Sequence, residues 1–211
     1  MSGKSAQKKH ETLNAISHGI GIVLGLVGLY LLLQRGDNTE PFRRFSIWVY
    51  SATILLMFTV STLYHTVEGP VLKARLRILD HISIYFLIAG TYTPVSLILL
   101  ETGNGWPMFY IVWAIALCGT LIKLFYTGKY EIVSLLLYLA MGWLIVWDFA
   151  DLWDQTSFLG LMLLFSGGLL YTTGIVFYIN EKIRYNHFIW HLFVLGGAIC
   201  HWTFIFIDVV G

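Results

Sequence analysis

Seven apolar segments, each long enough to cross a lipid bilayer as a helix, constrain the fold of this chain most. A membrane-spanning helix needs about 20 consecutive, mostly apolar residues. Seven segments meet that requirement, with turn-forming or charged residues between them: 14–33, 45–64, 79–100, 106–124, 132–149, 158–178 and 187–209. The sequence therefore predicts an all-α, polytopic membrane protein in which residues 1–211 form a single seven-transmembrane helix bundle.

The composition agrees with a membrane protein and excludes several other classes. Only 12% of the residues are charged and 57% are hydrophobic, whereas roughly 25% of a soluble domain is charged. A net charge of +1 argues against nucleic acid as a partner. Both cysteines, Cys118 and Cys200, lie inside apolar segments, so we expect neither a disulfide framework nor a cysteine-based metal site. The first apolar run is too long for the core of a cleavable signal peptide.

The basic residues between the apolar segments predict how the helices are oriented. Cytoplasmic loops of membrane proteins carry an excess of lysine and arginine. Seven spans leave ten basic residues on the side of the N-terminus: Lys4, Lys8, Lys9, Lys73, Arg75, Arg77, Lys123, Lys129, Lys182 and Arg184. The other side has three, which are Arg35, Arg43 and Arg44. We therefore expect a cytoplasmic N-terminus and a C-terminus outside the cell.

Two histidines in the first turn of the last segment are the first candidates for function. His187 and His191 are spaced i and i+4, which puts their Cβ atoms on one helix face about 6 Å apart. That spacing suits two imidazoles that bind one metal ion, and ionisable side chains inside a membrane are costly enough to be functional candidates by default. The alternative is a pair of interfacial histidines that only hydrogen-bond to neighbours.

Other polar residues are predicted to meet this pair at the same depth. With the N-terminus inside, His65 ends the second span and Asp80 starts the third, both at the cytoplasmic end, and Ser61 lies one turn before His65. Three neutral imidazoles leave a fourth position open for water, which is typical of a catalytic zinc site. Asp80 could then accept a proton from that water, and Ser61 could stabilise a developing oxyanion.

Each of these residues also has a purely structural interpretation. His65 could be an ordinary interfacial histidine at a helix end. Asp80 could cap the N-terminus of the third span, and Ser61 could hydrogen-bond back to a carbonyl of its own helix.

A second polar set lies on the first span at the same end. Glu11, Asn14 and His18 follow one helical stripe, and we expect them to support the metal ligands or to pack against them. Glu11 could instead be only a first-turn acid, and His18 could instead be a metal ligand itself. The stripe continues into Gly21, Gly25 and Gly28, small residues that predict close contact with neighbouring helices.

Two further histidines are not expected to bind the same metal. His81 points about 100° away from Asp80 around its helix. His201 lies ten residues after His191, about 15 Å along the helix.

Four motifs in this order resemble the hemolysin III family, the bacterial branch of the progestin and adipoQ receptor superfamily. They are Glu11-x-x-Asn14-Ala15-x-x-His18-x-x-Gly21, Ser61-x-x-x-His65, the stretch from Asp80-His81 to Thr93-Pro94, and His187-x-x-x-His191. The resemblance implies a multi-pass protein of the bacterial inner membrane with a zinc site near the cytoplasmic face. It implies that His65, His187 and His191 bind the zinc, that Asp80 bonds the zinc-bound water, and that Ser61 lies beside it.

The alkaline ceramidases look like distant relatives of the same pattern, which suggests hydrolysis of a lipid amide. We therefore expect a zinc-dependent hydrolase of a membrane-lipid amide or ester that acts at the inner leaflet. One alternative is a receptor-like regulator of membrane lipid homeostasis with a structural zinc. A second is a cytolysin, although the sequence has no channel-lining charge pattern and no secretion signal. Membrane lipids are the expected substrate or ligand, and the sequence does not indicate an oligomeric state.

Overall fold

The computed structural model describes residues 2–35 and 42–211, and in that part of the chain all regular structure is helical. Seven helical spans within it are long and apolar enough to cross a membrane: Gln7–Gln34, Arg43–Thr66, Pro70–Leu99, Gly105–Tyr126, Glu131–Gln155, Phe158–Ile179 and Asn186–Val209. The prediction of an all-α fold with seven long apolar helices is confirmed. Which ends of these helices face the cytoplasm stays a prediction.

Several spans combine an α-helix with a shorter irregular helix. The α-helices that stand alone are α1 (Ser2–Gln34), α2 (Arg43–Thr66), α4 (Gly105–Tyr126) and α7 (Phe158–Ile179). The third span joins α3 (Pro70–Pro94) to the π-helical η1 (Val95–Leu99), and the last joins α8 (Asn186–Phe204) to the π-helical η3 (Ile205–Val209). The fifth span consists of α5 (Glu131–Trp143), the 3₁₀-helical η2 (Leu144–Asp148) and α6 (Phe149–Gln155).

The helices extend beyond the apolar segments that predicted them. The third helix begins at Pro70 instead of residue 79, because a polar first part that includes Lys73, Arg75 and Arg77 continues the apolar part as one helix. Proline is favoured at such a helix start because its missing N–H has no intrahelical partner there. The fifth span likewise continues past residue 149 to Gln155. Apolar length marks only the part of a helix that contacts hydrocarbon.

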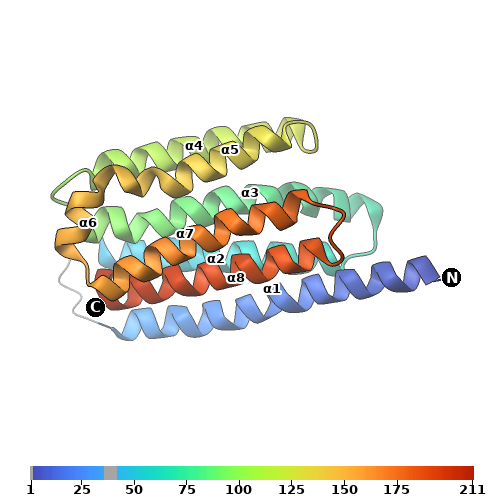
Figure 1. The fold of residues 1–211 in the computed structure, drawn as a ribbon, viewed down its shortest axis with the longest axis horizontal. Helices are drawn as coiled ribbons and strands as arrows, with labels where there is room; N and C mark the ends of the chain where they lie inside the picture. Colours follow the sequence, from blue (N-terminus) through green and yellow to red (C-terminus); the bar gives the residue numbers. More distant parts are fainter. Residues whose placement is uncertain (1, 36–41) are drawn as a thin grey trace.

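The third span lies at the centre of the bundle. In its most apolar stretch 78% of the residues are buried, against 22% to 56% in the other spans. Figure 1 shows α4 and α5 together along one edge of the bundle and α1 along the opposite edge. Helix α1 packs against both α2 and α8, and α8 packs against α7.

The glycine stripe of α1 lies at these close contacts, as the sequence predicted. A side chain at Gly21 would collide with Phe58 of α2, and one at Gly28 would collide with Trp202 of α8. Helix α1 can therefore lie close to α2 and α8 at once, which brings its polar end beside both.

The break in the fifth span is fixed to the central helix by Tyr92. The hydroxyl of Tyr92 accepts a hydrogen bond from the N–H of Ile145 (2.8 Å) and donates one to the carbonyl of Gly142 (3.2 Å). These two bonds satisfy backbone groups at the point where α5 tightens into the 3₁₀-helical η2. They hold α5 beside α3 at one wall of an internal cavity.

Candidate metal centre and the adjoining cavity

Three histidines from two helices form a buried cluster. His65 lies in the last turn of α2, while His187 and His191 lie at the start of α8. One nitrogen from each ring lies within 4.8 Å of the corresponding nitrogens of the other two. The rings themselves are 4.7 to 5.1 Å apart between centroids. The structure thus brings together the three residues that the sequence singled out, in an arrangement that could hold a metal ion.

The start of α8 is set by the residue before it. Tyr185 adopts a left-handed conformation, with φ at 62°, so the chain turns sharply and the helix begins at Asn186. Its ring stacks on that of His10, with centroids 4.3 Å apart. His187 is consequently placed in the first turn of α8.

The hydrogen bonds of the cluster leave specific ring nitrogens available. Nδ1 of His65 lies 2.7 Å from the Oε2 atom of Glu11, and Nδ1 of His191 lies 3.1 Å from the carbonyl oxygen of Asn14. The Nε2 atoms of His65 and His187 are buried and have no hydrogen-bond partner in the described part of the chain. Buried polar atoms are normally paired. These two nitrogens are therefore suited to bind a metal ion, which accepts their lone pairs. Three imidazoles form a donor set for a transition metal or zinc.

Residues of the polar stripe on α1 hold these rings in place through hydrogen bonds and ring stacking. Ligating histidines usually donate their other ring N–H to a carboxylate or a backbone carbonyl, and Glu11 and Asn14 supply one of each. The amide nitrogen of Asn14 also lies 3.5 Å from Nδ1 of His65. His18 stacks flat on His191, with centroids 3.6 Å apart and planes 7° apart. All three residues therefore contact the cluster.

Two further contacts were missed by reasoning from the sequence. Nζ of Lys73, on α3, lies 3.0 Å from the second carboxylate oxygen of Glu11. The hydroxyl of Ser17 donates to the carbonyl of Asn14 (2.8 Å) and lies 3.1 Å from Nδ1 of His191. Ser17 follows Asn14 by three residues on the same stripe and could have been found from that spacing. The contact of Lys73 depends on helix packing, which no local pattern reveals.

Asp80 and Ser61 line a cavity that begins at the histidine cluster. Ser61 lies beside Asp80, and its hydroxyl forms no regular hydrogen bond within residues 2–35 and 42–211.

The structure also tests the purely structural interpretations of these residues. The alternative that Asp80 caps the third span is wrong, because α3 begins ten residues earlier, at Pro70, with Gly69 as its cap. The Ser61 hydroxyl does not donate a hydrogen bond to a carbonyl of its own helix in the described part of the chain. His65 is 6% exposed and is not an ordinary interfacial histidine.

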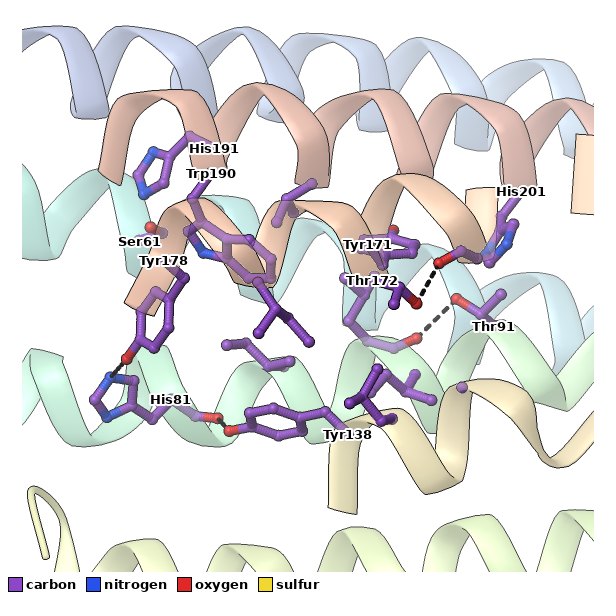
Figure 2. Close-up of a pocket in the computed structure, with 18 of the residues that line it drawn as sticks. Ser61, His81, Thr91, Tyr138, Tyr171, Thr172, Tyr178, Trp190, His191 and His201 are labelled. Carbon is purple, nitrogen blue, oxygen red and sulfur yellow. Dashed lines mark hydrogen bonds between the residues drawn. The ribbon is translucent and has the colours of Figure 1, made fainter. Parts of the chain in front are cut away.

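The cavity has a volume of about 110 Å³ and extends from His191 to His201 along α8 (Figure 2). Ten residues of helix correspond to about 15 Å. Between its ends the wall is mostly apolar and includes Ile84, Leu87, Ile88, Ile175 and Val194.

The two histidines that were not expected to be ligands both line this cavity but do not belong to the cluster. Nε2 of His81 lies 3.5 Å from the hydroxyl of Tyr178. Nε2 of His201 donates to the carbonyl of Leu164 at 3.0 Å. Figure 2 shows Tyr178 and His81 near the end marked by Ser61 and His191, and His201 at the opposite end with Thr91 and Thr172.

Comparisons with known proteins agree with the pattern of motifs. The family described as "Haemolysin-III related" matches residues 6–202. The chain is 40% identical to Hemolysin-3 of Bacillus cereus over 191 residues, which cover 90% of this chain and 87% of that protein. It is also 40% identical to the Hemolysin-3 homolog of Bacillus subtilis, over 90% of each chain. The human monocyte to macrophage differentiation factor is 34% identical over 201 residues, 90% of this chain and 80% of its own length.

Proposed function

The chain belongs to the haemolysin-III related family, and from that premise we propose that it is a zinc-dependent hydrolase of a membrane-lipid amide or ester. One observation carries the proposal. Two members of the buried histidine cluster, His187 and His191, line an apolar cavity that a carboxyl group and a hydroxyl group also line, and buried ring nitrogens of the cluster have no hydrogen-bond partner in the described part of the chain. A site of this kind combines metal ligands, acid–base groups and room for a hydrocarbon chain.

Zinc is the metal that suits this donor set best. His65, His187 and His191 would hold it through one nitrogen each, and three neutral imidazoles with an open fourth position are the ligands of a catalytic zinc. A bound zinc ion supplies Lewis-acid polarisation of a carbonyl and the activation of water. Glu11 and the Asn14 carbonyl hold two of the rings through Nδ1, which fixes the direction in which Nε2 of each ring points.

In hydrolysis, Asp80 would accept a proton and Ser61 would stabilise the charge that develops on the substrate. Asp80 lines the same cavity as His187 and His191 without being part of the cluster, so its carboxylate would accept a proton from an attacking water in that cavity. The hydroxyl of Ser61 lies beside the Asp80 carboxyl group and forms no regular hydrogen bond in the described residues, so it would be able to turn and donate a hydrogen bond to the oxyanion that develops on the substrate carbonyl.

The cavity favours a lipid as the substrate. A wall lined by Ile84, Leu87, Ile88, Ile175 and Val194 binds hydrocarbon by removing apolar surface from water. The predicted orientation puts the histidine end in the inner leaflet, at the depth of the amide or ester carbonyls of lipids. The bacterial relatives support a location in the cell membrane of a bacterium.

A second candidate is a regulator of membrane lipids in which zinc only ties helices together. The observation that favours it is that the cluster and the residues bonded to it come from four helices. His65 belongs to α2, His187 and His191 belong to α8, and Glu11 of α1 joins His65 to Lys73 of α3. A metal ion here would therefore connect four helices. Cytolysis, which the name of the Bacillus cereus relative indicates for that protein, is a third candidate for this chain.

Metal analysis of the purified protein, together with lipid analysis of membranes with and without it, tests the proposal. We expect about one zinc per chain, as three ligands predict, and the loss of one class of amide- or ester-linked lipid with a gain of free fatty acid. Zinc without any change in lipid composition would favour the regulator. Protein without a bound metal would overturn both.

A further inference from the structure

The end of the cavity at His201 adjoins a second, smaller one. Six residues line both the main cavity of about 110 Å³ and a neighbouring cavity of about 30 Å³. We call these six the constriction: Thr91, Tyr92, Gly142, Trp143, Gly168 and His201. The smaller cavity is completed by Val95, Ile145, Leu164 and Phe165, whose side chains are all apolar.

The polar side chains of the constriction already have partners inside the protein. Most of these partners are backbone carbonyls. The bonds are Thr91 Oγ1 to the Leu87 carbonyl (2.8 Å), Tyr92 OH to the Gly142 carbonyl (3.2 Å), His201 Nε2 to the Leu164 carbonyl (3.0 Å) and Trp143 Nε1 to the Thr172 hydroxyl (3.0 Å). A polar ligand group would have to break one of these bonds, which costs free energy. The ligand end that fits the constriction is therefore apolar.

Two glycines keep the constriction open. A Cβ atom at Gly142 would meet nothing within 4 Å, and one at Gly168 would lie 3.6 and 3.7 Å from the ring of Trp143, an ordinary contact. By contrast, a Cβ at the neighbouring Gly167 would collide with His201. Gly167 is thus required for helix packing, whereas larger residues at Gly168, which is partly buried, and at Gly142, which is exposed, would not force the helices apart.

We propose that the constriction sets the length of the acyl chain that the protein binds. The polar end of the lipid lies at the histidine cluster, its chain extends about 15 Å along α8, and its end passes between Gly142 and Gly168 into the smaller cavity. This inference rests on the proposed function only in that the ligand carries an acyl chain, because it does not require hydrolysis.

Equilibrium binding of radiolabelled straight-chain fatty acids, from octanoic to octadecanoic acid, tests the inference on the purified full-length protein. Burying one methylene group changes affinity by about fourfold. In the parent protein, affinity should rise with chain length and then level off once the smaller cavity is filled. In Gly168→Leu and Gly142→Leu, the rise should stop at shorter chains, so that the longest acids lose about tenfold or more while the shortest bind as before.

Gly19→Leu is the matched control. Gly19 also has nothing within 4 Å of its Cβ position, but it lies on α1 and does not line the cavity. The affinity of this variant should depend on fatty-acid chain length in the same way as that of the parent. The inference would be overturned if both cavity variants kept the parent profile, if both lost affinity equally at every length, or if the parent bound no fatty acid.

The outcomes separate this inference from the proposed hydrolase. A parent that binds fatty acids with this dependence on length, but hydrolyses no lipid, would refute the hydrolase and leave the constriction supported. A parent that hydrolyses lipids equally well at every chain length would refute the constriction and leave the hydrolase supported.

Discussion

Replacement of Glu11 should weaken metal binding, although Glu11 is not itself a ligand. Its Oε2 atom lies 2.7 Å from Nδ1 of His65, so it fixes the ring in the orientation that presents Nε2 to the metal. Removal of such a supporting group typically lowers metal affinity by about 10- to 100-fold, which corresponds to about 1.4 to 2.8 kcal/mol. We expect Glu11→Ala to fall in that range and Glu11→Gln to lose less, because glutamine retains an oxygen that can accept the bond.

Lys73 provides the matched control, because it contacts the same carboxylate without touching a ligand. The side chains of Lys73 and Glu11 are each 28% exposed, whereas the side chain of His65 is only 4% exposed. An ion pair that water reaches contributes about 0 to 1 kcal/mol. Lys73→Ala should therefore lower metal affinity by at most about fivefold.

The assay is competition for zinc between metal-free protein and a coloured chelator of known affinity, with helix content followed by circular dichroism. The reasoning would be refuted if Glu11→Ala, with unchanged helix content, bound zinc within twofold of the parent. It would also be refuted if Lys73→Ala lost as much affinity as Glu11→Ala, because the ion pair and not the orientation of His65 would then carry the effect.

Three further predictions follow from the fold and the cluster. His187→Ala and His191→Ala should lose most of the bound zinc, and a chelator should lower the Tm of the parent but not that of either variant; a chelator effect of equal size in the variants would contradict the ligand assignment. A C-terminal reporter that is active only in the cytoplasm should be silent, because ten of the thirteen basic residues lie on the N-terminal side; a strong signal would reverse the orientation. Sealed vesicles that contain the purified protein should hold their ions, and leakage in proportion to protein would favour the cytolysin.

The meeting of the three histidines could be predicted from the sequence because a helix ties residue number to position along its axis. Each residue advances about 1.5 Å along the axis, so once the spans were placed, His65, His187 and His191 had to lie at a similar depth. The spacing of Glu11, Asn14 and His18 likewise put them on one face of α1. Local periodicity and length were sufficient for these features.

The contacts between helices could not be predicted in the same way. Which helix faces which depends on packing, for example on Gly21 and Gly28, which bring α1 against α2 and α8. The ion pair of Lys73 with Glu11 joins residues 62 positions apart. The polar start of α3 hid the fact that the helix begins at Pro70, and this is why Asp80 could be mistaken for a cap. The cavity that joins His191 to His201 is lined by side chains of several helices, and no single segment shows it.

Measurement of Asp80→Asn tests most directly whether the zinc is catalytic. Asp80 lines the cavity but does not belong to the histidine cluster, so the variant should fold and bind zinc as the parent does. If Asp80 accepts the proton of the attacking water, release of fatty acid from lipid should fall by about 10²- to 10⁴-fold, and Ser61→Ala should show a smaller loss of the same kind. An Asp80→Asn protein with normal zinc content and unchanged activity would contradict the hydrolase and leave zinc as a structural link between helices.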